Sequence, residues 1–559
     1  MKKLSISISD FKEIIENGHY FLDKSLFIKE IINSDAKVLL LPRPRRFGKT
    51  LNLSMLKYFF EKSQETNKQL FKDLGIEKEK KIMNLQGQYP VIFLTFKDIK
   101  ELNWDNTISK IKDLIAQEFS KHDYLVNSNT LKNFEKEYFN NIISKKAEQS
   151  DYENSLKNLS IWLAKFYNKK TIILIDEYDS PITAGYLKNY YDQIIGFMRN
   201  FLSAGLKDNS YLEKAVITGV LRVAKESIFS GLNNLKVYSI LNENFSEYFG
   251  FLQNEVEEIL NYYGLESKIA EVKEWYDGYN FAQNKIYNPW SIINFIADKG
   301  EFGIFWVNTS DNELIKNLIT NGDENLKKDI ESIVANKINK HIINDTIIFK
   351  DIEKISESTL NLLLFSGYLT VSGVKYNKNQ DAFLGKLSIP NREIRSLYKN
   401  IIRYWFNASI GKDNYKLMLK NLINGNIKEF QDYFSNFVLS SFSTFDLPEN
   451  ESEKVYHSFV LGMLISLNKD YILKSNRESG FGRYDVILIP KNKNKLGIIL
   501  EFKKAKEKES LTESSQDALK QIQDKKYDQE LKDLGIKNLL LLGIAFKGKM
   551  VEISSMGKI

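Results

Sequence analysis

The chain of 559 residues contains no cysteine. This absence excludes disulfide bonds and thiolate metal sites, and it fits a reducing compartment. No uninterrupted apolar run approaches the roughly 20 residues that a membrane-spanning helix needs. The first ten residues include two lysines but lack the apolar segment of a secretory signal. We therefore expect a cytoplasmic protein with no membrane partner.

Histidine is scarce, and neither sign of charge dominates. The chain has 79 Lys and Arg against 72 Asp and Glu, and a net charge of +7 over this length is weak support for nucleic-acid binding. Hydrophobic residues make up 43% of the chain, which is enough for several cores. The four histidines are too scattered to predict a metal cluster: His19, His122, His341 and His457.

Apolar strands alternate with helical stretches in the first 235 residues, which predicts a parallel sheet covered by helices on both faces. The strands are Val38–Leu41, Val91–Phe96, Thr171–Ile175 and Ala215–Thr218. Residues 236–445 have mostly helical patterns, and residues 446–559 form an α/β module with a hairpin. The length also predicts several domains, so we place their boundaries at 1–235, 236–445 and 446–559.

Residues 43–50 follow the phosphate-loop pattern G-x-x-x-x-G-K-[ST] except at its first position. The segment leaves a strand and opens a helix, where backbone N–H groups can surround phosphate. Lys49 would reach the β- and γ-phosphates, and the Thr50 hydroxyl would bind Mg²⁺. Arg43 replaces the first glycine, and the three arginines of the loop could face phosphate or an acidic partner. The predicted nucleotide contacts are Arg46, Phe47, Gly48, Lys49 and Thr50.

The third apolar strand ends in two carboxylates, Asp176 and Glu177. Ligands of parallel sheets bind at the carboxyl ends of the strands. Asp176 would therefore hold Mg²⁺, and Glu177 would polarise the attacking water. The alternative is a buried strand that ends in a solvated acidic turn.

The fourth strand ends at Thr218, which could sense the γ-phosphate in an ATPase with an extra central strand. Arg199 and Arg222 are candidates for contacts with the nucleotide or with a neighbouring subunit. Surface positions are the alternative for both arginines.

A hairpin in the C-terminal module places two carboxylates and a lysine together. If Pro490 pairs with Leu496, the same register sets Asp485 opposite Glu501, with Cβ atoms about 5 Å apart. Lys503 shares a face with Glu501 because strand side chains alternate. Two carboxylates this close repel unless a cation lies between them, and Mg²⁺ needs only one or two carboxylates. The alternative is a surface hairpin with a Glu–Lys pair.

Nearly the whole chain resembles the bacterial AAA-ATPase-like family; the resemblance is specific in the first 300 residues and weakest over residues 300–445. The resemblance rests on the phosphate loop with its Arg-Pro-Arg-Arg-Phe-Gly-Lys run and on further segments: Tyr20–Lys24, Leu51–Leu56, Asp176–Pro181, Thr218–Gly219, Phe229–Asn234, Trp275–Tyr279 and Tyr287–Trp290. Members of this family commonly carry a C-terminal nuclease domain of the PD-(D/E)XK superfamily.

The order Asp485, Glu501, Lys503 resembles the PD-(D/E)XK pattern, whose members often add an acid on the preceding helix and a Gln…Tyr helix. Glu453, Gln521 and Tyr527 match these additions. The resemblance implies an α/β fold: a P-loop NTPase domain, a helical lid or middle region, and a restriction-endonuclease-like domain.

Three functions follow from these patterns. The first is an ATP-regulated, Mg²⁺-dependent nuclease, with DNA favoured over RNA as substrate and with any oligomer formed through the ATPase domain. The second is a switch-type ATPase whose C-terminal module only binds nucleic acid or protein. The third is a scaffold that binds nucleotide without hydrolysis. Glu177 beside Asp176 argues against the third, and the Asp485, Glu501 and Lys503 set argues against the second.

Overall fold

The computed structural model divides into two compact units. Unit 1 comprises Met1–Leu318 and Lys340–Ile394, and unit 2 comprises Ile319–Asn339 and Arg395–Ile559. The predicted middle region is therefore shared between the two units. The structure describes every residue except 64–65, 224–227, 230–233, 308–314, 316, 320–321, 335–339, 347, 353–354, 399–400, 402–411, 442–459, 461–462, 480–481, 507–508 and 558–559.

Unit 1 is built on a five-stranded parallel sheet, as predicted. The strand order is β2-β3-β4-β1-β5, so β4 lies between the strand of the phosphate loop and the strand that carries Asp176. β1 and β3 are buried along their whole length, which explains their continuous apolar sequences. The strands are β1 (Val38–Pro42), β2 (Val91–Thr95), β3 (Thr171–Asp176), β4 (Leu212–Gly219) and β5 (Leu235–Val237).

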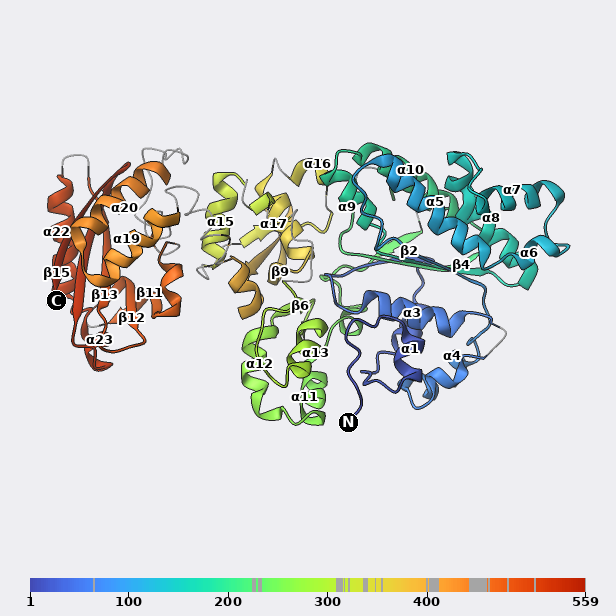
Figure 1. The fold of residues 1–559 in the computed structure, drawn as a ribbon, viewed down its shortest axis with the longest axis horizontal. Coiled ribbons are helices and arrows are strands. Elements are labelled where there is room, and N and C mark those ends of the chain that lie inside the picture. The colour runs from blue at the N-terminus through green and yellow to red at the C-terminus, as the bar shows by residue number, and fades with distance from the viewer. Residues whose placement is uncertain are drawn as a thin grey trace. The chain divides into compact units, whose positions relative to one another are not determined.

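Helices cover both faces of this sheet (Figure 1). One face carries α1 (Phe11–Glu16) and α3 (Lys49–Phe60), and the other carries α5 (Trp104–Ser120), α8 (Gln149–Tyr167) and α10 (Tyr191–Leu206). Shorter helices complete this part of the chain: α2 (Phe27–Asn33), α4 (Lys80–Met83), α6 (Tyr124–Asn127), α7 (Asn133–Ile143) and α9 (Ser180–Leu187).

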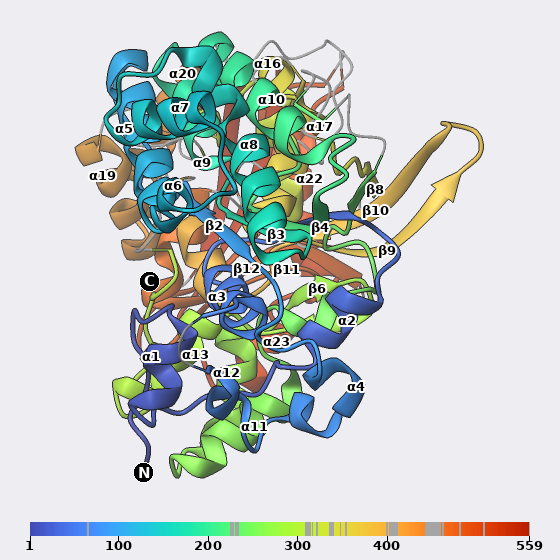
Figure 2. The ribbon, with the colours of Figure 1, turned by 90° about the vertical axis from the view of Figure 1, so that its right-hand side faces the viewer.

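The rest of unit 1 forms a helical subdomain and a small antiparallel sheet. The helical subdomain contains α11 (Gln253–Tyr262), α12 (Ile269–Tyr276), α13 (Pro289–Ala297) and the hairpin β6 (Tyr279–Phe281) and β7 (Asn284–Ile286). The small sheet has the order β8-β10-β9, and Figure 2 shows its β9–β10 hairpin projecting from the unit. The strands of this sheet are β8 (Lys340–Ile342), β9 (Thr370–Asn377) and β10 (Ala382–Ser388). Two helices lie between β8 and β9 in the chain: α16 (Phe349–Ile352) and α17 (Ser356–Phe365).

Unit 2 contains a five-stranded mixed sheet in the order β11-β12-β13-β14-β15. β13 and β14 are parallel, the other neighbours are antiparallel, and α22 makes the crossover. α22 covers one face of the sheet and α20 covers the other (Figure 1). The elements are α15 (Glu324–Val334), α19 (Lys412–Asn424), α20 (Ile427–Ser441), β11 (Tyr471–Ser479), β12 (Gly482–Pro490), β13 (Gly497–Lys504), α22 (Leu511–Asp524), α23 (Gln529–Asp533), β14 (Leu539–Lys547) and β15 (Met550–Gly557).

No helix in the described parts of the chain is both long and apolar enough to cross a membrane. The predicted helix before β11 lies mostly outside the described residues. The architecture confirms the expected fold class: an N-terminal α/β domain with a parallel sheet, a mainly helical middle and a C-terminal α/β domain.

Candidate active sites

The phosphate loop joins the buried strand β1 to helix α3, and Gly48 makes the turn between them. Gly48 has a φ of +82°, a left-handed conformation that favours glycine. No side chain caps the N-terminus of α3, so its first N–H groups remain open to an anion. Lys49 is buried, and its ammonium donates to the carbonyl of Pro44 at 3.0 Å. Burial lowers the pKa of Lys49, while the carboxylates of Glu177 and Asp176 oppose that effect.

Asp176 is fully buried and joins three strands and the loop helix through hydroxyl groups. Its Oδ2 accepts from Thr50 (2.7 Å) and Thr95 (3.4 Å), and its Oδ1 accepts from Thr218 (2.7 Å). Burial raises the pKa of Asp176, and the bonds from Thr218 and Thr50 lower it. The structure thus brings together the three residues predicted from separate motifs, and Thr95 is a partner that the sequence did not reveal.

These oxygen donors suit Mg²⁺. The ion is held in proteins by one or two carboxylates, with water and phosphate completing its coordination. The described residues contain no group of three or more acidic, histidine or cysteine side chains that could hold a metal. Thr50 and Asp176 would supply one hydroxyl and one carboxylate oxygen to such an ion.

Glu177 follows directly in a left-handed conformation, with a φ of +50°. Such a backbone is costly for a side-chain-bearing residue and often marks a functional position. The carboxylate remains partly exposed, and its Oε2 accepts a hydrogen bond from the Ser180 hydroxyl at 3.1 Å. The strand end thus buries Asp176 and presents Glu177 at the carboxyl edge of the sheet.

We expect Glu177→Gln to keep nucleotide bound but to slow ATP hydrolysis by about 100-fold or more, because glutamine keeps the shape and loses the base. Turnover and nucleotide affinity should be measured together. Ser180→Ala is the matched control, since it removes only the partner of the carboxylate. Wild-type turnover in Glu177→Gln would place water activation on another residue.

Asp179 ties the ends of β3 and β4 together. It is buried, and its Oδ2 accepts from the backbone N–H groups of Val220 (2.9 Å) and Leu221 (2.8 Å). A Cβ at Gly219 would lie 2.4 Å from its Oδ1, so only glycine fits there. Burial raises the pKa of Asp179 to about 6. In the Asp-Glu-Tyr-Asp run, Asp176 accepts a hydrogen bond from Thr218, and Asp179 holds the chain that follows β4.

The three arginines of the loop have different surroundings. Arg43 is fully buried and donates to the carbonyl of Tyr238 at 2.7 Å, and burial lowers its pKa to about 9. Its φ is not left-handed, so the position does not need glycine. Arg43 is therefore a core residue that faces neither phosphate nor an acidic partner. Arg46 lies over the ring of Trp290, with 4.2 Å from guanidinium to centroid, and Arg45 lines a neighbouring cavity.

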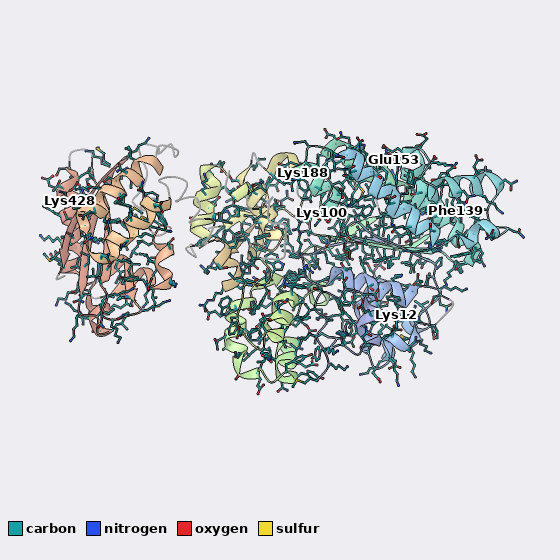
Figure 3. All side chains as sticks on the ribbon, in the orientation of Figure 1. Lys12, Lys100, Phe139, Glu153, Lys188 and Lys428 are labelled. Carbon is teal, nitrogen blue, oxygen red and sulfur yellow. The ribbon has the colours of Figure 1, made fainter. Side chains whose placement is uncertain are left out.

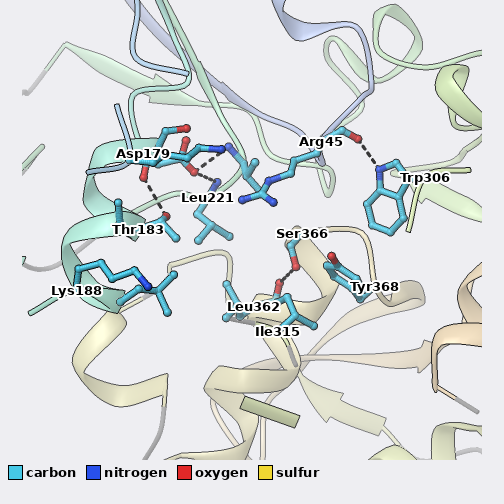
Figure 4. A pocket seen from close by; sticks show the side chains of 15 residues that line it. Arg45, Asp179, Thr183, Lys188, Leu221, Trp306, Ile315, Leu362, Ser366 and Tyr368 are labelled. Atoms are coloured by element: carbon cyan, nitrogen blue, oxygen red, sulfur yellow. Dashed lines mark hydrogen bonds between the residues drawn. The ribbon is translucent and has the colours of Figure 1, made fainter. Parts of the chain in front are cut away.

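That cavity, of about 90 Å³, opens beside the ends of β3 and β4 (Figure 4). Asp179 and Leu221 form one wall, and Trp306 and Tyr368 form another. Lys100 and Lys188, labelled in Figure 3, also line it, as do Ser180, Thr183, Ala184, Leu187, Val220, Ile315, Leu362 and Ser366.

A second cavity of about 90 Å³ borders Gly48. Three segments line it: the N-terminal segment, the start of α3 and the helical subdomain. The first segment is fixed by Lys24, whose ammonium pairs with Glu255 at 2.5 Å. The lining includes Tyr20, Phe21, Leu22, Phe47, Leu51, Tyr248, Phe251 and Ile259. Phe47, predicted as a nucleotide contact, is buried there against the rings of Tyr279 and Phe281.

The two further arginines lie on α10 and just after β4. Arg222 pairs with Asp345 at 2.8 Å within unit 1. Arg199 is half-buried on α10. A nucleotide or subunit contact by either residue stays a prediction.

In unit 2, the predicted register of the hairpin is confirmed. Val486 pairs with Leu500, and the next two pairs follow the same register. Beyond them, the carboxylates bond to the facing strand: Phe502 N–H donates to Asp485 Oδ2 (2.9 Å), and Asp485 N–H donates to Glu501 Oε2 (3.2 Å). Asp485 and Glu501 therefore lie together at one end of the hairpin. Burial raises the pKa of Asp485 to about 6, and the bond from Phe502 opposes it.

Helix α22 brings the Gln…Tyr segment to these carboxylates. A Cβ at Gly543, the residue paired with Glu501, would lie 2.2 Å from the carbonyl of Ser515, so glycine allows the helix to sit closely on the sheet. Gln521 then donates its side-chain N–H to Glu501 Oε1. Tyr527 is buried beside the hairpin, and burial raises its pKa.

Lys503 faces the same helix, where its ammonium lies 3.6 Å from Asp517, a partner that sequence reasoning missed. Asp517 lies one helical turn before Gln521, and that spacing was the available signal. Glu453, the predicted accessory acid, lies outside the described residues. Asp485 and Glu501 supply two carboxylates, which suits Mg²⁺.

Comparisons with known proteins find one family match within unit 1 and a second within unit 2. Residues 5–229 match a family model described as "Predicted AAA-ATPase", and residues 451–556 match a model described as "PD-(D/E)XK nuclease superfamily". The expected pairing of these two domains is confirmed, and it supports ATPase and nuclease-like roles. A protein of Azotobacter chroococcum mcd 1, described as "Uncharacterized protein in vnfD 5'region", is 25% identical over 560 residues, covering 98% of this chain and 96% of that protein.

Proposed function

We propose that this cytoplasmic protein binds and hydrolyses ATP in unit 1 and cleaves nucleic acid in unit 2, with Mg²⁺ in both sites. The observation that carries the proposal is the meeting of Thr50, Asp176 and Thr218 beside the uncapped N-terminus of α3. The open N–H groups of α3 would hold the phosphates, and the adjacent oxygen atoms would hold Mg²⁺, as binding of a Mg²⁺-nucleotide requires.

Each group has a defined task in the ATPase site. Bound Mg²⁺-ATP would supply the phosphoanhydride bond and the divalent charge. Lys49 would exchange its bond to Pro44 for phosphate oxygens, and the N–H groups of α3 would hold the same oxygens. Glu177 would orient and deprotonate water, while Thr218 would sense the terminal phosphate. The apolar cavity beside Gly48 suits the base.

In unit 2, Asp485 and Glu501 would hold the metal, and Gln521 would keep Glu501 in place. A bound metal would activate water and stabilise charge on the phosphodiester. Lys503 would orient that water or neutralise phosphate charge. We favour DNA over RNA as the substrate. Purified full-length protein should hydrolyse ATP and cut plasmid DNA or RNA when Mg²⁺ is present. The absence of both activities in the presence of Mg²⁺ would contradict the proposal.

The second candidate is a switch-type ATPase whose C-terminal domain only binds nucleic acid or protein. The ion pair between Lys503 and Asp517 favours it, because that pair holds the lysine on α22. Tight nucleic-acid binding without cleavage, in the presence of Mg²⁺, would select this candidate.

We further expect ATP to change the cleavage rate, because a nucleotide-binding domain fused to a nuclease allows control of cleavage. A tenfold change requires only about 1.4 kcal/mol of differential binding between two domain arrangements. The measurement compares cleavage without nucleotide, with ATP and with a non-hydrolysable analogue, and Lys49→Ala should remove any difference. Three equal cleavage rates from an active enzyme would show that nucleotide binding in unit 1 does not control cleavage in unit 2.

A further inference from the structure

One buried carboxylate in unit 1 joins two segments that are far apart in sequence. Glu393 is only 2% exposed. Its Oε2 accepts from the Ser291 hydroxyl at 2.7 Å, and its Oε1 accepts from the backbone N–H groups of Trp306 (2.5 Å) and Val307 (3.4 Å). Burial raises the pKa of Glu393, and these hydrogen bonds oppose that effect. The carboxylate therefore fixes the start of α13 relative to the chain at residues 306–307.

Each of these two segments carries a tryptophan that contacts the phosphate loop. Trp290, next to Ser291, lies under the guanidinium of Arg46 at 4.2 Å. The Trp306 indole donates to the carbonyl of Arg45 at 3.0 Å, a bond drawn in Figure 4. The two tryptophans thus hold adjacent residues of the loop, one through a side chain and the other through the backbone.

The surroundings of Trp306 fix its ring in place. The ring is fully buried, with its centroid 5.0 Å from that of Tyr368. A Cβ at Gly367 would lie 2.9 Å from Pro44 of the loop, and the φ of Gly367 is +90°. The segment therefore approaches the loop too closely for a side chain at that position.

An ordinary core position would not need this carboxylate. A buried carboxylate is costly unless it is fully hydrogen-bonded, so an apolar residue would fill the same space at lower cost. Three directed hydrogen bonds instead set the relative position of two segments. Both segments contact the loop that is predicted to bind triphosphate.

We propose that Glu393 is a positioning residue that holds Trp290 and Trp306 against the phosphate loop, and that this pair of tryptophans keeps the loop in its nucleotide-binding shape. The proposal rests on the nucleotide site described above.

The test measures ATP affinity, KM and kcat of full-length Glu393→Gln and Trp306→Phe. We expect both variants to bind ATP about tenfold more weakly, because Glu393→Gln loses a charged acceptor and Trp306→Phe loses the indole N–H donor. The kcat at saturating ATP should change much less, since neither residue contacts the reacting atoms. ATP should also change the tryptophan fluorescence of the wild type, and Trp306→Phe should reduce that change.

Two variants provide matched controls. Glu118→Gln alters another buried carboxylate of unit 1, which accepts from the N–H of Phe93 at 3.1 Å. Trp162→Phe removes another buried indole, which donates to Glu135 at 3.0 Å. Both controls should keep wild-type ATP affinity. Trp306→Phe also covers the case in which Glu393→Gln does not fold.

The outcomes separate the two proposals. Wild-type ATP affinity in folded Glu393→Gln and Trp306→Phe would overturn the positioning role and leave the ATPase proposal intact. An equal loss of affinity in the controls would also overturn it, because the effect would then be general destabilisation. No ATP binding by the wild type would overturn the proposed function and this role with it.

Discussion

Replacing Lys49 with alanine is expected to abolish detectable ATP hydrolysis and to weaken ATP binding by roughly 100-fold, the effect of losing about 3 kcal/mol of charge-assisted contact in a buried site. Lys49 is buried and lies at the first turn of α3, where its ammonium now donates to a carbonyl of its own loop. A phosphate oxygen is a better acceptor for that ammonium because it is charged.

The variant should fold as well as the wild type. Burial lowers the pKa of Lys49, so alanine removes a group whose charged form is costly in the fold. Lys57→Ala is the matched control: Lys57 lies on the same helix and faces Glu61 at 3.9 Å. Binding measured by calorimetry and turnover measured by phosphate release should both fall only in Lys49→Ala. Unchanged turnover in that variant would refute the nucleotide site.

The sequence predicted those elements whose burial leaves a recognisable pattern of apolar residues along the chain. β3 is buried on both faces, so its run Thr171–Ile175 had no alternation and ended where the carboxylates began. The hairpin of unit 2 could be placed to the residue because a one-residue slip would turn every side chain to the other face. Its register then brought Asp485 to Glu501.

Other features depend on residues that lie far apart in the chain. Glu393 is separated from Ser291 by 102 positions, and Trp306 from Arg45 by 261. No periodicity connects such residues, because only the packing of α13 and the chain near residue 306 brings them to the loop. The interpretation of Arg43 was incomplete for the same reason: its acceptors include the carbonyl of Tyr238, 195 positions away.

Sequence also left the cavity beside Gly48 unassigned. Its walls come from the N-terminal segment, the loop helix and the helical subdomain, and each contributes mainly apolar side chains. The segment Tyr20–Lys24 was part of the family resemblance, but the residues alone did not indicate what the segment does. The structure supplies one, since Lys24 pairs with Glu255 on α11 and so fixes one wall of that cavity.

Replacing Asp485 with asparagine is expected to reduce nucleic-acid cleavage below detection while leaving ATP hydrolysis at the wild-type rate. Asparagine keeps an oxygen that can accept from Phe502 N–H, so the end of the hairpin should stay in place. It removes one of the two carboxylates, and a hard cation depends on that charge. Cleavage of plasmid DNA and of RNA should be followed over a range of Mg²⁺ concentrations.

Asp470→Asn is the matched control, because Asp470 lies in the same unit and its carboxylate forms an exposed pair with Lys495 at 3.3 Å. It should cleave as the wild type does. A partial recovery of Asp485→Asn at high Mg²⁺ would indicate weakened metal binding, as the proposal expects. Full activity at low Mg²⁺ would show that the hairpin does not hold the catalytic metal. A parallel loss of ATP hydrolysis would mean that the substitution disturbs more than the nuclease site, since Asp485 belongs to unit 2 and every residue assigned to the ATPase belongs to unit 1.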